Sequence, residues 1–490
     1  MRRFIAVNSK ETPKNLAADV VVIGSGGGLA AAVAAAEEGA GVILLEKVSI
    51  LGGYTRQANG FTACESPVQK RENITVTTDE YFRKLMNWSH WSRVEPRIVR
   101  AYVNKTGDTI RWLEEKGVKF GEVSVSYTHQ LPIGHMPVGL GNAMQKALIK
   151  SARDLGVETL INTSGKKILK GARGNINGVV AMNKAGEELR IKTRSVIIAT
   201  GGFGNNRDLL KKHCPDYYDG MHLDLWPHRE AHSGDGLFMA EEIGAGIAGS
   251  VPIYHLGPYY PGFMYPWQKV LAMAIDRRTV WVNKMGRRFV DEADYDVWEM
   301  GNAILLQPDK VMYSLYDDEI RSALEKEGRL RRHSKLDEEQ SFKDFSGLHE
   351  ELRKQVKAGG TMIADTWDEI AGWIGADPEV LKAEIAEYNS YCDRGRDEIF
   401  ARTENLHPLH RPPYYAMRCY ARVGETLGGI KANERMEVLD TRGDVIPGAY
   451  VAGVLVDGFA AQTNSVSPMG FAVNSGRIAG ENAARYALKK

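Results

Sequence analysis

The stretch DVVVIGSGGGLAAAVAAAEEGAGVILLEK, residues 19 to 47, constrains the fold of this chain more than any other. Residues 20–23 and 42–45 are continuous apolar runs, which is the pattern of strands buried on both faces of a parallel sheet. Between them, the alanine-rich segment 29–38 predicts a helix that Gly39 closes. Strand, glycine turn, helix and strand in this order predict an α/β fold with a Rossmann-like, doubly wound domain.

The glycine turn in this stretch predicts a dinucleotide site. Gly24 and Gly26 allow a tight turn in which the backbone can approach a pyrophosphate, and the N–H groups of the next helix would then face it. Glu46 ends the second strand, where a carboxylate can accept hydrogen bonds from ribose hydroxyls. The third glycine of G-x-G-x-x-G is replaced by leucine, so close packing of helix on strand must rely on Gly28 and the alanines at 30–32.

Length and composition set the frame for the rest of the chain. A chain of 490 residues exceeds what one hydrophobic core usually organises, so two domains are expected. The formal charge of +1 gives no electrostatic footprint for nucleic acid or an anionic membrane surface. No window approaches the roughly 20 apolar residues of a membrane span. A small-molecule partner and a cytoplasmic location are therefore predicted.

The cysteines argue against metal chemistry. All four are scattered singly, without the paired spacing that a zinc site, an iron–sulfur cluster or an attached haem requires; they are Cys64, Cys214, Cys392 and Cys419. No metal site is expected, and a reducing compartment is the simplest interpretation.

Four further segments carry a family resemblance. They are LEKVSILGGYTRQANG at 45–60, VIIATGGFGNNRDLL at 196–210, AHSGDGLFMAEEIGA at 231–245 and GAYVAGVLVDG at 448–458. With the glycine turn, they make the chain resemble, nearly end to end, the flavoprotein subunit family of fumarate reductases, succinate dehydrogenases, urocanate reductases and 3-ketosteroid dehydrogenases. The resemblance implies FAD as the dinucleotide. It also implies a glutathione-reductase-like FAD-binding domain at 1–249 and 421–490, with an inserted α+β capping domain at 250–420 that closes over the flavin.

The resemblance also implies which residues contact FAD. They belong to the glycine turn, the second strand end, the GG-x-[ST] loop, the ATGG strand end, the GDG turn, the segment 453–454 and the start of the last helix. The residues expected to bind FAD are Gly24, Gly26, Gly27, Gly28, Glu46, Lys47, Gly52, Gly53, Tyr54, Thr55, Asn59, Gly60, Ala199, Thr200, Gly201, Gly202, Asp235, Gly453, Val454, Gly470, Phe471 and Ala472.

Two of these positions depart from the family pattern. The covalent branch has a histidine where this chain has Tyr54, so FAD should be bound non-covalently. The glutamate that holds the ribityl chain in the family is replaced by Val454, so one FAD contact is lost. FAD should still be retained, because the amides of the glycine turns do not depend on that side chain.

Positions that bind a dicarboxylate in the family are also changed. In RRFVDEADYD, residues 287–296, the proton-donating arginine of the family falls at Asp296, and the late histidine before T-x-GG falls at Glu425. A threonine–glutamate pair falls near residues 271–272, and a further arginine falls in 462–470, which has no basic residue. Two unit charges about 6 Å apart interact by roughly 3 kcal/mol at an effective dielectric of about 20, so repulsion replaces attraction and fumarate is disfavoured. Arg277 and Arg278 keep a carboxylate substrate open as an alternative.

The expected capping domain is rich in aromatic residues at IYHLGPYYPGFMYPW, residues 253–267. These side chains form either a packed satellite core or a pocket for a flat, largely uncharged molecule. His255 falls within one residue of a family substrate-site histidine, and tyrosines are candidate proton donors, as in the ketosteroid dehydrogenases. The candidate catalytic residues are Tyr254, His255, Tyr259, Tyr260, Tyr295, Asp296 and Glu425.

The function expected is a FAD-dependent oxidoreductase that makes or breaks a C=C bond next to a carbonyl. Reduction of an enone in a steroid-like or aromatic substrate, with hydride from flavin N5, is the leading hypothesis. The alternatives are reduction of an unsaturated carboxylate and a catalytically inert FAD-binding scaffold. Because no second dinucleotide fingerprint occurs, a separate electron donor or acceptor is expected.

Overall fold

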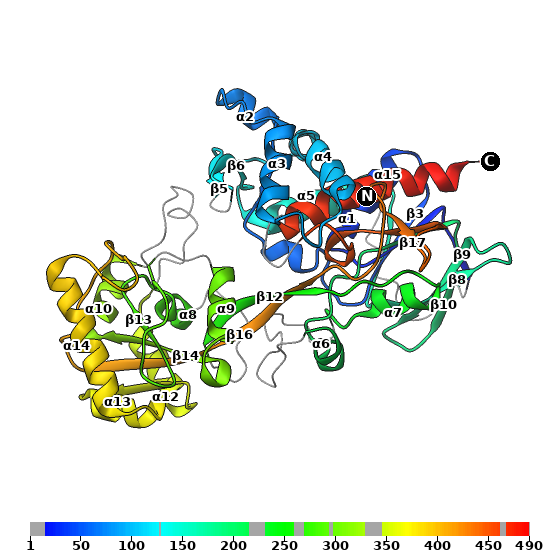
Figure 1. Ribbon diagram of the computed structural model, residues 1–490. Helices are drawn as coiled ribbons and strands as arrows, with labels where there is room; N and C mark the ends of the chain where they lie inside the picture. Colours follow the sequence, from blue (N-terminus) through cyan, green and yellow to red (C-terminus); the bar gives the residue numbers. More distant parts are fainter. Residues whose placement is uncertain are drawn as a thin grey trace. The chain divides into compact units, whose positions relative to one another are not determined.

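The computed structural model describes residues 15–126, 129–214, 231–258, 269–293, 297–328, 345–460 and 467–489. These residues form two compact units (Figure 1). The first contains described residues up to 252 and from 425 onward, and the second contains described residues from 253 to 424.

The first unit is built on a six-stranded sheet in which five adjacent strands are parallel and one edge strand is antiparallel. In spatial order the strands are β17 (Glu437–Leu439), β18 (Val445–Val451), β11 (Ser195–Ile198), β2 (Val20–Ile23), β3 (Val42–Glu46) and β7 (Glu158–Ile161). Every residue of β2 and β3 is buried, as the continuous apolar runs predicted, and every residue of β11 is buried as well. The α/β fold class is thereby confirmed.

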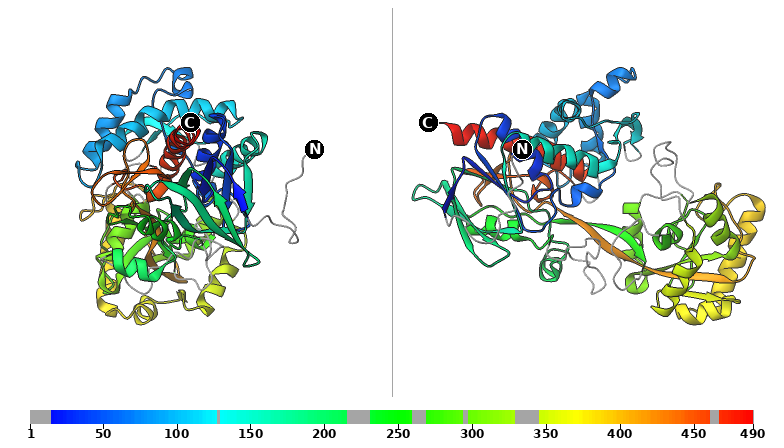
Figure 2. Two further views of the ribbon diagram at one scale, coloured as in Figure 1. Left: turned by 90° about the vertical axis from the view of Figure 1, so that its right-hand side faces the viewer. Right: turned by 180° about the vertical axis from the view of Figure 1, so that it is seen from behind.

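Helices α1 (Gly28–Glu37) and α15 (Pro468–Leu488) lie side by side on one face of this sheet, and they stay together in every view (Figures 1 and 2). Glycines of α15 allow the close approach, because a Cβ at Gly476 would lie 2.4 Å from the Gly27 carbonyl oxygen and one at Gly480 2.3 Å from that of Ala31. A Cβ at Gly28 would lie 3.0 Å from Val22. The predicted close packing of helix on strand at Gly28 is therefore confirmed, and α15 adds a contact that the sequence had not indicated.

A second sheet of four strands contacts β3, β11 and β18 from the opposite side, so the first unit has three layers. Its order is β1 (Asn15–Ala17), β10 (Glu188–Lys192), β9 (Ile176–Asn183) and β8 (Thr163–Lys170). A small third sheet contains β4 (Phe61–Thr62), β6 (Leu131–His135) and β5 (Ser124–Ser126). The other helices of this unit are η1 (Tyr54–Gln57), α2 (Pro67–Arg71), α3 (Thr78–Trp88), α4 (Pro96–Glu115), α5 (Leu140–Asp154), α6 (Arg207–His213), α7 (Asp235–Glu242) and η3 (Gly453–Leu455).

The second unit surrounds a five-stranded sheet with helices. Its strands are β12 (Val251–Pro258), β16 (Tyr414–Leu427), β14 (Val311–Asp317) and β13 (Val280–Asn283), with β15 (Thr361–Ala364) also paired to β16. Its helices are α8 (Lys269–Ala274), α9 (Val297–Leu305), η2 (Pro308–Lys310), α10 (Asp318–Glu327), α12 (Leu348–Lys357), α13 (Trp367–Ile374) and α14 (Pro378–Arg394). Its paired strands β14, β15 and β16 are antiparallel, in contrast to the parallel core of the first unit.

Candidate functional site

The glycine turn after β2 packs so tightly that side chains are excluded from it. Gly24 has φ +93°, and a Cβ there would lie 2.4 Å from the carbonyl oxygen of Ala199 at the end of β11. A Cβ at Gly27 would lie 2.6 Å from the carbonyl oxygen of Ala472 in the first turn of α15. Three predicted FAD-binding segments therefore meet at the carboxyl ends of the parallel strands, where α/β sheets bind their ligands.

Glu46 connects the turn to the next loop through hydrogen bonds within the chain. Its buried carboxylate accepts from the backbone N–H and hydroxyl of Ser25 and from the N–H of Val48 at 3.0 Å. The Ser25 hydroxyl in turn accepts from the N–H of Gly52 at 2.9 Å. Glu46 thus holds the turn and the GG loop in register, and its predicted bond to a ribose stays a prediction.

The GG loop itself lies directly on the glycine turn. A Cβ at Gly53 would lie 3.1 Å from Gly26, and one at Gly26 would lie 3.3 Å from the hydroxyl of Thr55. At the end of the loop, the Gly60 carbonyl accepts a hydrogen bond from Ser467, the N-cap of α15, at 3.1 Å. The loop, the turn and the start of α15 form one continuous cradle, while Asn59 is exposed.

One atom in this cradle has its hydrogen-bonding capacity unused. The hydroxyl oxygen of Thr200 is buried, and none of the described residues provides it with a partner. It lies against α7, where a Cβ at Gly236 would come within 2.2 Å of it. Buried hydroxyls nearly always have partners. An orphaned hydroxyl among glycines that leave the backbone accessible fits a polar ligand of the dinucleotide type.

Lys47 and Asp235, from two different predicted motifs, bind each other. The Lys47 ammonium lies 2.8 Å from the Asp235 carboxylate and also donates to Ser233. The neighbouring residue His232 was missed in the sequence, although it lies inside the quoted segment 231–245. Its buried ring lies edge-on to Tyr54, with ring centroids 5.7 Å apart. Burial, with a smaller contribution from Lys47, lowers the pKa of His232 to about 4, so this histidine is neutral.

A second group missed in the sequence is a cluster of hydroxyls beside the start of α15. The Tyr102 hydroxyl donates to the Thr62 carbonyl at 3.1 Å, and Tyr81 shares a hydrogen bond with the Thr62 hydroxyl. A Cβ at Gly470 would lie 3.1 Å from the Tyr102 hydroxyl oxygen. Burial raises the pKa of both tyrosines, that of Tyr102 to about 12. Both phenols are therefore neutral donors near the predicted flavin end of α15.

The segment 453–454 meets the cradle through its backbone. The N–H of Gly453 donates to Ser475 of α15 at 2.9 Å, and the Val454 carbonyl accepts from the N–H of Gly428 at 2.7 Å. Val454 is half-buried, and its aliphatic side chain has no atom that could hydrogen-bond a ribityl chain. Phe471 stacks on Phe459, with ring centroids 4.0 Å apart, and stiffens the first turn of α15.

Glu425 is the predicted catalytic residue whose side chain is best described. It precedes Thr426 near the end of β16, and the Thr426 hydroxyl accepts a hydrogen bond from the N–H of Phe203 at 2.9 Å. Glu425 is half-buried, and its Oε2 is buried without a partner among the described residues. Burial of a carboxylate without donors disfavours its charge, and it raises the pKa of Glu425 to about 8.

The other catalytic candidates cannot be placed. The backbone of Tyr254 and His255 belongs to β12, but their side chains lie outside the described residues. Four further candidates lie outside the described residues altogether; they are Tyr259, Tyr260, Tyr295 and Asp296. Their roles remain predictions from the sequence.

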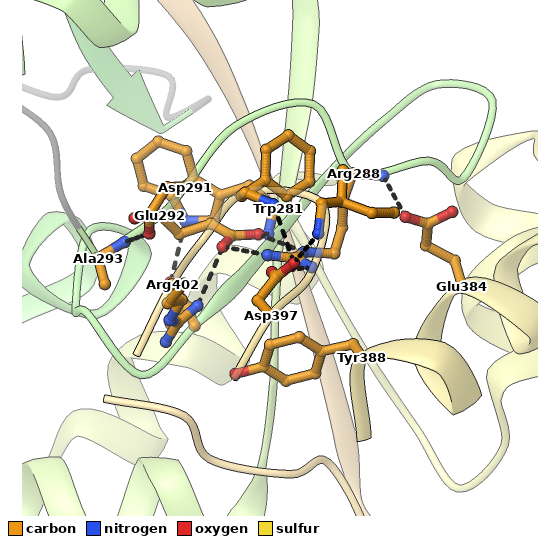
Figure 3. Close-up of polar contacts among 12 residues, drawn as sticks. Trp281, Arg288, Asp291, Glu292, Ala293, Glu384, Tyr388, Asp397 and Arg402 are labelled. Carbon is orange, nitrogen blue, oxygen red and sulfur yellow. Dashed lines mark hydrogen bonds and ion pairs between the residues drawn. The ribbon is translucent and has the colours of Figure 1, made fainter. Parts of the chain in front are cut away.

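The acidic segment 287–300 contributes to a buried ionic cluster in the second unit. Glu292 is fully buried between Arg288 and Arg402, whose guanidinium groups donate to it at 2.9 and 3.0 Å (Figure 3). The N–H of Trp281 donates to it at 3.0 Å, and Arg288 also pairs with Asp397 at 2.7 Å. Burial by itself would raise the pKa of Glu292, but the charges and hydrogen bonds of the two arginines outweigh burial and lower it. Glu292 and Asp397 therefore stabilise the fold of the second unit.

Arg278, a candidate for binding a carboxylate, is also committed inside the second unit. Its fully buried guanidinium forms a two-pronged bond to Asp276, at 2.7 and 3.0 Å, and donates to the Gly328 carbonyl at 3.0 Å. A third contact joins it to Glu327 at 3.2 Å. Arg278 therefore stabilises the turn before β13 and has little capacity left for a ligand.

No helix in the described ranges combines the length and the apolar character that a membrane span requires.

A family model described as FAD binding domain matches residues 19–466. A vinyl phenol reductase of Lactiplantibacillus plantarum is 32% identical over an alignment that covers 96% of this chain and 97% of its own length. A cytochrome-type fumarate reductase of Shewanella frigidimarina is 28% identical, over 96% of this chain and 78% of its own length.

Among solved structures, the open conformation of a flavocytochrome c3 fumarate reductase superposes with a TM-score of 0.75 at 23% identity, covering 97% of this chain and 79% of its own. That likeness supports the fold, while the family match and the relatives also support the cofactor and the reaction type. The chain therefore belongs to the FAD binding domain family and is a FAD-dependent oxidoreductase of the fumarate reductase type that acts on C=C bonds.

Proposed function

We propose that this enzyme reduces a C=C bond conjugated to a carbonyl or a phenol ring in a neutral, largely apolar aromatic or cyclic substrate. The observation that carries this proposal is the commitment of three arginines in the second unit, Arg278, Arg288 and Arg402. Each has a side chain about 1% exposed and is paired with an internal carboxylate. Releasing one of them to a substrate would leave a buried acid unpaired, which is strongly unfavourable.

The similarity to a vinyl phenol reductase supports the same substrate class. That relative covers nearly the whole chain, and its name describes a neutral aromatic alkene. The aromatic segment 253–267 has the composition of a pocket for a flat molecule. We favour a small aromatic alkene over a steroid as the substrate, because the alkene in the name of this relative is attached directly to a single ring.

FAD, when bound, supplies the hydride for such a reduction. The residues that would hold it are Gly24 and Gly26, whose turn would admit the pyrophosphate, Thr200, whose hydroxyl has no partner among the described residues, and the amides at the start of α15. Tyr54 replaces the histidine of the covalent branch, so binding is non-covalent. The second unit would serve as the capping domain, and electrons would come from a separate donor.

The test is anaerobic reoxidation of the reduced flavin. Purified protein is reduced with dithionite and then mixed with 4-vinylphenol, an enone, a steroid 3-ketone, an aryl acrylate or fumarate, while the oxidised flavin band is followed. We expect a neutral alkene to restore the band and fumarate to leave it unchanged. Rapid reoxidation by fumarate would contradict the proposal, and no reoxidation by any alkene would favour the inert scaffold.

A further inference from the structure

Glu425 directly precedes Thr426, which contacts the predicted flavin cradle, and no described residue hydrogen-bonds to the buried Oε2 of the Glu425 carboxyl group. Its neighbour Thr426 binds the ATGG loop, because a Cβ at Gly202 would lie 2.2 Å from the Thr426 hydroxyl. Two residues later the backbone pairs with the segment 454–455, through Gly428 to Val454 at 2.7 Å and Ile430 to Leu455 at 2.9 Å. The chain thus fixes the backbone that directly follows Glu425, at the C-terminal end of β16.

The buried oxygen of the carboxyl group has no comparable contact in the described part of the chain. This oxygen is Oε2, and no described residue donates a hydrogen bond to it. A buried acceptor without a donor is unfavourable by about 1–3 kcal/mol, so an atom of this kind calls for a donor, which a bound ligand can supply. In its ionised form, the Glu425 carboxylate accepts a hydrogen bond from a neutral hydroxyl and repels a substrate carboxylate. A hydroxyl donor therefore suits this form of Glu425 better than an acid does.

We infer that Glu425 recognises a phenolic hydroxyl of the substrate and accepts its proton while the conjugated C=C bond is reduced. This inference rests on the proposed function, and it adds the chemical group that the substrate must have. It makes Glu425 a specificity-determining and catalytic residue.

The proposed step balances in atoms and electrons. The phenol O–H bond breaks and its proton moves to the Glu425 carboxylate, so that the oxygen's electrons shift through the ring toward the terminal carbon of the vinyl group. That carbon takes a proton from solvent, which breaks the C=C π bond and leaves a neutral quinone methide. The hydride that FAD would supply when bound would then form the new C–H bond at the carbon next to the ring. The ring regains its aromaticity, and the phenolic oxygen takes its proton back from Glu425.

The acidity of Glu425 suits this exchange. Burial raises its pKa to about 8, within about two units of an ordinary phenol at about 10, whereas an unshifted carboxyl at 4.5 would lie more than five units away. The raised pKa therefore improves the proton-transfer equilibrium by about three powers of ten.

Few charged groups perturb Glu425. No charged neighbour contributes to its shift in the described part of the chain. Among the segments that pair with 426–430, the titratable side chain is Asp457, whose pKa is raised by its own burial. Arg422 on the same strand is three residues away, an odd number, so a regular strand directs it to the opposite face.

The experiment compares the wild type with Glu425→Gln and Glu425→Leu, with Glu115→Gln at an exposed site as the matched control. Binding is measured with 4-ethylphenol and 4-ethylanisole, which cannot be reduced, by the change in the oxidised flavin spectrum. We expect the wild type to prefer the phenol by about tenfold or more, and Glu425→Leu to lose that preference. An unchanged preference in Glu425→Leu would overturn the inference.

Turnover provides the second readout. In Glu425→Gln, the ratio of kcat/KM for 4-vinylphenol to that for an enone without a hydroxyl should fall at least tenfold, since an amide can bind a phenol but cannot hold its proton. Wild-type kcat/KM for 4-vinylphenol should rise with pH up to about 8 as Glu425 ionises, and this rise should be absent in the variant. An unchanged ratio would refute the role of Glu425 and leave the proposed function standing. A wild type that reduces no alkene would refute the proposed function itself.

Discussion

Two carboxyl groups in this protein meet burial in opposite ways. Glu292 in the second unit is fully buried, receives hydrogen bonds from two arginines and a backbone N–H, and has a lowered pKa. Glu425 in the first unit is half-buried, has no donor for its buried oxygen, and has a pKa raised to about 8. A region that serves the fold satisfies its own polar groups, whereas a region that binds a ligand leaves some of them for the ligand to satisfy.

Replacing Glu292, the carboxyl group that has its own partners, should have the largest effect on stability. Glu292→Gln removes the charge that two buried arginines share, and we expect it to lower the free energy of unfolding by about 3–5 kcal/mol. The measurement is urea unfolding followed by tryptophan fluorescence. Glu319→Gln is the control in the same unit, because its pair with Arg411 is mostly exposed and should contribute less than about 1 kcal/mol. Equal effects of the two variants would show that the cluster is not a structural core.

The FAD cradle can be disrupted by a substitution that changes no charged group. Gly24→Ala forces a side chain into a position with φ +93° and places it against the Ala199 carbonyl, so the purified variant should lose its FAD. Gly39→Ala has nearly the same strain, φ +89°, but open space around the new methyl group, and it should keep FAD while losing about 1–2 kcal/mol of stability. Flavin absorbance per protein measures the difference. Retention of FAD by Gly24→Ala would contradict the packing described for the turn.

The contributions of Glu425 and Glu292 to stability should change with pH in opposite directions. Glu425 binds its proton more tightly in the folded protein, so its contribution to stability is present at low pH and is lost as pH rises from about 4.5 to about 8. Glu292 has a lowered pKa, so its contribution is present above the unfolded pKa and is lost as pH falls. The melting temperature of Glu425→Gln apoprotein should therefore gain on the wild type between about pH 5 and about pH 8. A constant difference over that range would refute the raised pKa.

The smallest expected effect concerns Thr200. Thr200→Val removes a hydroxyl that has no partner in the described chain, so the melting temperature of the apoprotein should not fall. If FAD supplies the partner, the dissociation constant for FAD should increase about fivefold, the equivalent of one hydrogen bond of about 1 kcal/mol. Fluorescence titration of the apoprotein with FAD measures this. A fall in apoprotein stability with unchanged FAD affinity would assign Thr200 to the fold instead.

Local patterns in the sequence predicted the centre of the first unit well. Residues 20–23 form β2 as predicted, 42–45 lie within β3, and the helix predicted at 29–38 spans Gly28–Glu37. These elements depend on hydrophobic periodicity and on glycine positions, both of which are local. The predicted role of Gly28 in packing was confirmed for the same reason, because its neighbours on β2 are set by the turn itself.

Contacts between distant residues could not be predicted in this way. The partner of Lys47 is Asp235, which lies 188 residues away, and Glu292 pairs with Arg402 across 110 residues. The acidic stretch 287–300 suggested a substrate site that had lost an arginine. In the structure, Glu292 of this stretch forms ion pairs with Arg288 and Arg402 in a structural cluster. Charge patterns in a sequence do not show which charges will be neutralised.

By itself the sequence determined the α/β core, the glycine turn and the segments from which a FAD cradle would be built, because backbone conformation and burial follow from nearby residues. Only the tertiary structure decided which buried acid is neutralised by partners and which is left without them. That distinction depends on donors contributed by remote strands and loops. The electrostatic free energy of a carboxyl group is set by what surrounds it in space rather than by its place along the chain.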